Sequence, residues 1–323
     1  MRPESFISLP LTPPPTGEKT TSSVSRIIEE IRNRQKGRSL MSIPWARYTL
    51  DLKGYQDLLQ QLQSEESLWR FAQDKLRYDY FSSASRLVLR TPGFLHEQFI
   101  AIVVKEIQTQ LDSIEGASAA FAKKIIPSGS ASIKFADQGY CKHDPDAQFR
   151  HSKARYPGVV IEVSHSQKRK DLERLADDYI LGSESEIRVV VGLDIEYKMN
   201  KKATLSVWQP SIVINEAGEK ELITQKIITN AVFRDSNGNP NTSRTEGLQL
   251  GLQDFTTIAL AKPEAGLCGS IAISAKTLCL FLEYAEDQVS IVKQQTDVVT
   301  SAKPWVRKRR REITPPEELS HED

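Results

Sequence analysis

The chain lacks the residues and runs that mark several large classes of protein. Its 323 residues include only three cysteines, Cys141, Cys268 and Cys279, and their spacing is unpaired. This excludes a disulfide framework and a cysteine-based zinc site, and it favours a reducing compartment. No apolar run approaches the roughly 20 residues of a membrane helix, and the first residues lack the apolar stretch of a secretory signal. We therefore expect an intracellular protein without a membrane partner.

Common catalytic motifs are missing as well. The sequence contains no Gly-x-Ser-x-Gly element of a serine hydrolase and no glycine-rich phosphate loop before a helix. The histidines near the centre show no metal-ligand spacing and are interpreted as incidental: His96, His143, His151 and His165. The 43 basic and 42 acidic residues leave a net charge of +1, so any basic surface for nucleic acid must be local.

Composition and periodicity divide the chain into five parts. We expect a flexible Pro/Ser/Thr-rich N-terminus (1–43), a helical module (44–91), an α/β core (92–210), a β/α extension packed on that core (211–300) and a charged flexible tail (301–323). A short helix is expected over 25–31 within the first part. The tail contains Arg307 to Arg311, a basic run typical of a nuclear-localisation signal or a nucleic-acid contact.

The core has a regular alternation of expected elements. A long helix is expected over 92–114, because Leu95, Phe99, Val103, Ile107 and Leu111 recur at helical spacing. The elements that follow are strands at 125–135, 146–149 and 158–164, a helix at 167–181, and strands at 186–193 and 203–208. The strand–helix–strand order predicts a parallel pair joined by a right-handed crossover. In the extension, strands are expected at 222–233 and 248–255 and a helix at 274–286. The fold class is therefore α/β (α+β).

Two acids in the core point to metal chemistry. Asp146 follows Pro145 at the start of a short strand, and Glu162 interrupts the apolar run Val159–Val163. Strand alternation puts Glu162 and Ser164 on one face, and pairing of the two strands would bring Asp146 beside Glu162. Hard oxygen ligands suit Mg²⁺ or Mn²⁺, and Glu97 of the long helix, which we expect to face the interior, could add a third. Two structural alternatives stay open, a simple turn for Asp146 and an ion pair of Glu162 with Lys134 or Arg188.

The helix after the second strand begins with the basic run Gln167, Lys168, Arg169, Lys170. Cations in a first turn oppose the helix dipole. The arrangement becomes favourable when an anion, such as a substrate phosphate, lies beside it.

Together these motifs resemble the PD-(D/E)XK nuclease superfamily. The resemblance is carried by Pro145-Asp146, then Glu162-Val163-Ser164-His165-Ser166, then the basic helix start. It is similar to a fungal branch with an E-V-S-x-S-type motif, to which Arg77 to Tyr80 and His96-Glu97 are also similar. It covers about residues 92–210 and implies a restriction-endonuclease-like core, with Asp146, Glu162 and Glu97 as metal ligands. The catalytic lysine of the family falls on Ser164, and Lys168 or Gln167 would be its substitutes.

The resemblance supports three hypotheses. The first is a hydrolase, a magnesium-dependent phosphodiesterase or endonuclease acting on DNA rather than RNA, weak or inactive because Ser164 replaces the lysine. The second is a catalytically degenerate nuclease fold that binds nucleic acid or protein. The third is a structural fold whose acids pair with internal bases.

Overall fold

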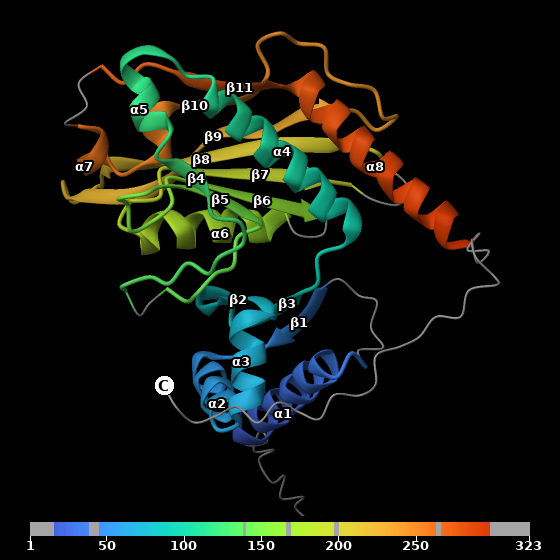
Figure 1. The fold of residues 1–323 in the computed structure, drawn as a ribbon. Helices are drawn as coiled ribbons and strands as arrows, with labels where there is room; N and C mark the ends of the chain where they lie inside the picture. Colours follow the sequence, from blue (N-terminus) through green and yellow to red (C-terminus); the bar gives the residue numbers. More distant parts are fainter. Residues whose placement is uncertain are drawn as a thin grey trace, which may run out of the picture.

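The computed structural model describes residues 16–38, 45–137, 140–165, 169–196, 200–262 and 266–297. An N-terminal module of helices and a small sheet lies below a larger sheet that carries helices on both faces (Figure 1). Within the described residues no helix is long and apolar enough to cross a membrane. The basic run 307–311 lies outside the described residues.

The N-terminal module combines three helices with three strands. The helices are α1 (Thr16–Gln35), α2 (Leu52–Gln63) and α3 (Glu66–Asp74), and the strands are β1 (Trp45–Thr49), β2 (Arg77–Phe81) and β3 (Arg86–Arg90), with the short 3-10 turn η1 (Ser82–Ala84) between β2 and β3. The Asp51 side chain caps α2 by accepting from the Gly54 amide at 2.8 Å. The strands form an antiparallel sheet in the order β1-β3-β2. The expectation of a purely helical module missed this sheet, because four of the five residues in both β2 and β3 are buried and alternation is lost.

Helix α1 lies within the segment 1–43 that was expected to be flexible. It is also longer than the helix expected over 25–31. Val24, Ile27 and Ile31 are buried in the same apolar cluster as Leu58 and Leu68 of α2 and α3. Burial of this stripe stabilises a helix that its polar composition alone would not predict, since helices draw most of their stability from tertiary packing.

The larger sheet has six strands in the order β4-β5-β6-β7-β8-β9. Their bounds are β4 (Ile125–Pro127), β5 (Ala147–His151), β6 (Val159–His165), β7 (Val189–Ile195), β8 (Ala203–Ile214) and β9 (Lys220–Arg234). Helix α6 (Arg169–Gly182) joins β6 to β7, and these two strands are parallel as predicted. The other neighbours are antiparallel, so the sheet is mixed. The strand expected over 125–135 ends at Pro127, because the chain turns at Gly129 with a φ of +54°.

The two faces of the sheet pack against different helices. Helices α4 (Phe94–Asp112) and α8 (Ala275–Asp297) share a core with Val159, Ile161 and Val163 of β6. Val160 instead packs with Leu172 and its neighbours on α6. The alternation predicted for β6 is therefore confirmed, and it places Glu162 on the α6 face.

The remaining elements cover one end of the sheet. They are η2 (Gly116–Ser118), α5 (Ala119–Ala122), β10 (Gly247–Gly251), η4 (Leu252–Phe255), α7 (Ile258–Ala261) and β11 (Ser270–Ser274). Strands β10 and β11 pair antiparallel, and Leu248, Leu250 and Ile271 join the core under α4. The strand expected over 248–255 is thus a strand only to Gly251 and continues as η4. The helix expected over 274–286 extends to Asp297.

Candidate functional site

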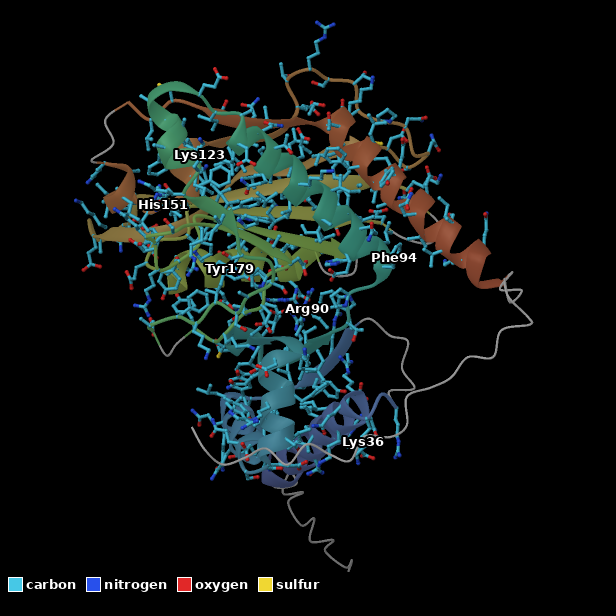
Figure 2. The ribbon with its side chains drawn as sticks, viewed as in Figure 1. Lys36, Arg90, Phe94, Lys123, His151 and Tyr179 are labelled. Carbon is cyan, nitrogen blue, oxygen red and sulfur yellow. The ribbon has the colours of Figure 1, made fainter. Side chains whose placement is uncertain are left out.

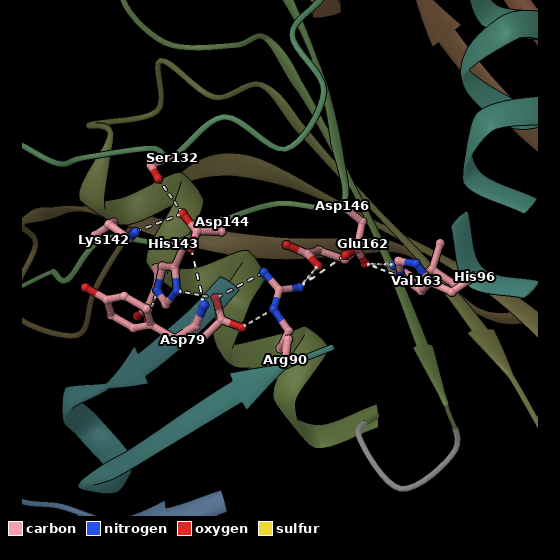
Figure 3. Close-up of polar contacts among 12 residues, drawn as sticks. Asp79, Arg90, His96, Ser132, Lys142, His143, Asp144, Asp146, Glu162 and Val163 are labelled. Atoms are coloured by element: carbon pink, nitrogen blue, oxygen red, sulfur yellow. Dashed lines mark hydrogen bonds and ion pairs between the residues drawn. The ribbon is translucent and has the colours of Figure 1, made fainter. Parts of the chain in front are cut away.

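The two acids singled out in the sequence meet in the fold. Asp146 directly precedes β5, and the register Ala147 opposite Ile161 places Asp146 across from Glu162 on β6. Their carboxylates lie at 3.2 and 3.3 Å from one nitrogen, Nη1 of Arg90. All three side chains are 2 % exposed, so this is a buried cluster of charge (Figure 3).

Arg90 comes from the N-terminal module. It ends β3 and lies where the module meets the larger sheet (Figure 2). Its Nε is 3.0 Å from Oδ2 of Asp79 on the neighbouring strand β2, and Asp79 is equally buried. One guanidinium therefore contacts three carboxylates, two from the larger sheet and one from the module.

His96 is the fifth member of the cluster. Its Nε2 lies 3.0 Å from Oδ2 of Asp146, which also accepts the Val163 amide at 2.8 Å. The neighbouring Glu97 was expected to face the interior, and this is wrong. Its side chain is 45 % exposed and pairs with Arg77 at 3.1 Å, because the buried stripe of α4 runs through His96 rather than through Glu97.

Glu162 and Ser164 each form a hydrogen bond with a further side chain. Tyr179 of α6 donates its hydroxyl to Oε1 of Glu162 at 2.7 Å. The Ser164 hydroxyl donates to Oδ1 of Asp194 on β7 at 2.7 Å. The Glu162 side chain is thus held by α6 and the Ser164 side chain by β7.

A histidine extends the cluster on the module side. His143 is buried between two acids, with Nδ1 at 3.1 Å from Asp79 and Nε2 at 2.8 Å from Asp178 of α6. Asp144 beside it accepts from the Ser132 hydroxyl at 2.5 Å and the Tyr78 amide at 3.3 Å. The Asp144-Pro145-Asp146 segment is therefore fixed at both ends rather than being a simple exposed turn.

Burial and charge together shift the titration of these groups. Burial alone would raise the pKa of Asp146, but His96, Arg90 and the Val163 amide outweigh it and hold the pKa well below its usual range. Asp79 behaves in the same way, since Arg90 and His143 overcome its burial and lower its pKa. Burial disfavours charge on the two histidines, yet their carboxylate partners raise the pKa of His96 and of His143 to about 9.

Glu162 shifts in the opposite direction. Its burial and the nearby Asp146 charge raise its pKa well above the usual value, against the pull of Arg90. The cluster therefore favours a protonated Glu162 beside an ionised Asp146. A carboxylic acid and a carboxylate that share one guanidinium carry less like-charge repulsion than two carboxylates would.

The space between the acids is already filled by protein. The cavity at Arg90, Glu162 and Ser164 measures about 20 Å³, which is room for about one water molecule. Within the ranges that the structure describes, no group of three His, Cys, Asp or Glu side chains is arranged to hold a metal ion. A hydrated Mg²⁺ contacting both Asp146 and Glu162 would have to displace the Arg90 guanidinium.

Of the residues proposed for the site, Asp146 and Glu162 are brought together. Ser164 lies on β6, two residues after Glu162. Glu97 points to the surface, and Gln167 and Lys168 lie outside the described residues. Among the described contacts, Glu162 does not pair with the proposed partners Lys134 and Arg188, and Arg90 takes that place.

Several members of the cluster were not assigned to the site from the sequence. They are Arg90, Asp79, His96, His143 and Tyr179. The interpretation of His96 and His143 as incidental is wrong, because both are buried against the acids of the cluster. Arg90 directly follows the apolar run Leu87-Val88-Leu89. Its signal is therefore related to that of Glu162 but weaker, because the charge lies at the end of the run and not inside it.

Comparisons of the chain with protein-family models, with curated proteins and with solved structures gave no match in any of the three. The class that the fold and the cluster define is therefore a mixed α/β protein with a six-stranded mixed sheet and a buried acid–arginine cluster at the junction with its N-terminal module.

Proposed function

We propose that this protein is a catalytically silent fold of the PD-(D/E)XK type that binds nucleic acid instead of cutting it. The observation that supports this is the position of Arg90, whose Nη1 contacts both Asp146 and Glu162. The sequence resemblance assigns these two acids to a divalent cation, and here a guanidinium contacts both of them instead.

An arginine can replace the charge of a metal but not its chemistry. A guanidinium donates hydrogen bonds in a fixed plane, whereas a metal coordinates a water and lowers its pKa. Ser164 cannot supply the missing positive charge either, since it is a neutral hydroxyl that is hydrogen-bonded to Asp194. The cluster as built therefore holds the module on the sheet without an activated nucleophile.

Nucleic acid is proposed as the partner because basic side chains gather locally on one edge. Residues 123–155, which form β4, β5 and their loops, carry six exposed cations: Lys123, Lys124, Lys134, Arg150, Lys153 and Arg155. On a chain of net charge +1 this is a local basic surface of the kind that contacts phosphates. We call the six cations named above the basic edge. The proposal of DNA rather than RNA as the nucleic acid follows from the resemblance.

A second candidate function is metal-dependent cleavage of DNA. It is favoured by the convergence of Asp146 and Glu162 on a single point, the distance pattern that a shared ligand requires. It needs Arg90 to leave that point, after which Mg²⁺ or Mn²⁺ held by the two acids would supply an activated water.

One experiment separates the two. Wild type and Glu162→Gln are incubated with supercoiled plasmid and with a labelled duplex, in Mg²⁺ and in Mn²⁺ at low salt. Gln keeps the shape of the protonated acid, and circular dichroism checks that both proteins fold. We expect both to retard the duplex equally and to leave the plasmid intact. Cleavage by wild type that Glu162→Gln abolishes would establish the second candidate instead, and neither binding nor cleavage would contradict a nucleic-acid role.

A further inference from the structure

A recess separate from the acid cluster lies on the same sheet face. It measures about 230 Å³ and is lined by the loop 128–134, by Gln148 and Arg150 of β5 and by residues 155–157 before β6. Gln148 lies opposite Val160, which packs on the α6 side, so alternation puts Asp146, Gln148 and Arg150 on one face. At about 3.4 Å per residue, Arg150 lies roughly 14 Å along the strand from the buried acid.

The charged lining of this recess is of one sign. Lys134, Arg150 and Arg155 contribute to it, and no acid is among its lining residues in the part of the chain that the structure describes. All three are exposed. Like charges crowded at a concave surface repel one another and raise the local concentration of anions.

The walls of the recess are fixed by buried groups. The side-chain amide of Gln148 donates to the Ala131 carbonyl at 2.6 Å, which ties β5 to the loop. Arg155 lies over the Tyr156 ring at 5.1 Å from its centroid. Stacking of this kind orients a guanidinium while its N–H edge stays able to donate. The Tyr156 hydroxyl in turn accepts the Ala136 amide at 3.2 Å.

We propose that this recess binds a phosphate monoester, either that of a small phosphorylated molecule or the terminal phosphate of a nucleic-acid strand. A monoester carries close to two negative charges at neutral pH and can accept from several cations at once. The volume far exceeds the roughly 10–15 Å³ that one water needs, so part of the attached group enters with the phosphate. The inference does not depend on the proposed function, since a phosphorylated small molecule would fill the recess equally well.

Isothermal titration with adenosine 5′-monophosphate, inorganic phosphate and adenosine tests the assignment. We expect binding of the first two, none of adenosine, and at least a tenfold loss of monophosphate affinity in both Arg150→Gln and Arg155→Gln. Lys53→Gln, which removes another exposed cation, on α2, should bind as wild type does. Equal affinity in all four proteins, or no binding of either phosphate at millimolar concentration, would overturn the proposal.

Two further ligands identify the source of the phosphate. Single-stranded oligonucleotides of one sequence, with and without a 5′-phosphate, are compared on wild type and Arg150→Gln. A tenfold preference for the phosphorylated strand that is lost in the variant assigns the recess to strand ends. Binding of the monophosphate with no such preference supports the proposal with a small molecule as the ligand.

Discussion

At the scale of single residues, Arg90 has the largest consequence. It is buried and contacts Asp79, Asp146 and Glu162. A buried ion pair contributes little net stability compared with an apolar replacement of the whole group, but removal of one partner leaves uncompensated charge. We therefore expect Arg90 to matter for stability mainly because it compensates the buried carboxylate charge.

Replacement of Arg90 by Met tests this role. The substitution keeps the apolar stem and removes the only guanidinium that faces all three acids in the described contacts. We expect a loss of about 3–5 kcal/mol in the free energy of unfolding, as for other broken buried pairs, measured by urea denaturation. Arg70→Met is the matched control, because its pair with Glu66 is 71 % and 77 % exposed and should contribute no more than about 0.5 kcal/mol. Equal losses in the two variants would contradict the account.

His96 predicts a pH dependence of stability. Burial opposes its charge, but Asp146 raises its folded pKa to about 9, against 6.5 when unfolded. A raised pKa contributes stability that is complete below pH 6.5 and is lost as pH rises through 9, because unfolding then releases a proton. The difference amounts to up to about 3 kcal/mol. Urea denaturation from pH 6 to 9.5 should show this decline in wild type.

His96→Gln should flatten the decline by about that amount. His143→Gln serves as the comparison, since its pKa is also raised to about 9 by Asp178 and Asp79 against the effect of burial. Each single variant should keep the contributions of the other histidine and of Glu162, whose raised pKa acts in the same direction. The double variant should keep only the part of the decline that is due to Glu162. An unchanged slope in His96→Gln would show that its pair with Asp146 is not formed in solution.

The candidate site was predictable from the sequence only in part, and the reason lies at this scale. Glu162 and Asp146 lie 16 residues apart in one local motif, and the assumption that their two strands pair brought them together. Arg90 is 56 residues from Asp146 and 72 from Glu162, so its place depends on how the module docks, which no local pattern encodes. His96 was missed because a one-residue error in helical phase exchanged it for Glu97.

At the scale of elements, strong periodicity gave reliable predictions. The stripe of α4 and the crossover through α6 follow directly from spacing, and both are confirmed. The short strands β2 and β3 were missed, since strands of five residues that are buried on both sides lack alternation. The segment 125–135 was overextended because its apolar residues continue past the turn at Gly129.

The position of Gly158 allows a test of how closely η4 packs against the start of β6. Gly158 precedes β6, and a Cβ there would lie 2.1 Å from the backbone carbon of Phe255 and 2.4 Å from the Thr256 nitrogen. Because backbone cannot rotate away as a side chain does, Gly158→Ala must push η4 off the sheet. We expect a loss of at least about 1–3 kcal/mol, the usual range for overpacking, in urea denaturation.

Gly93→Ala is the control for that substitution. Gly93 precedes α4, its φ is negative, and a Cβ added to it would meet no atom within 4 Å. Its replacement should cost no more than about 1 kcal/mol, because Ala is a poorer N-cap than Gly but meets no steric clash there. If Gly158→Ala were as mild, the close approach of η4 to the start of β6 would be wrong.

At the scale of the whole molecule, charge distribution separates a local binding surface from general attraction. The net charge of +1 gives little long-range attraction for DNA, so the proposed binding must come from the basic edge. Removing three of its cations would leave a net charge of −2, because +1 − 3 = −2. The same change made elsewhere on the surface would alter the net charge equally but leave the edge intact.

The last prediction compares two triple variants that change the net charge by the same amount. In the test variant Lys123, Lys124 and Lys153 are replaced by Gln, and in the control Lys53, Lys105 and Lys276; all six are exposed. Each phosphate contact contributes about −0.9 to the slope of log affinity against log salt on duplex DNA. The test variant should therefore flatten the slope by up to about 2.7, while the control keeps the wild-type slope. The slopes are measured by fluorescence anisotropy of a labelled duplex between low and moderate salt. Equal flattening in both variants would mean that net charge, and not the basic edge, governs binding.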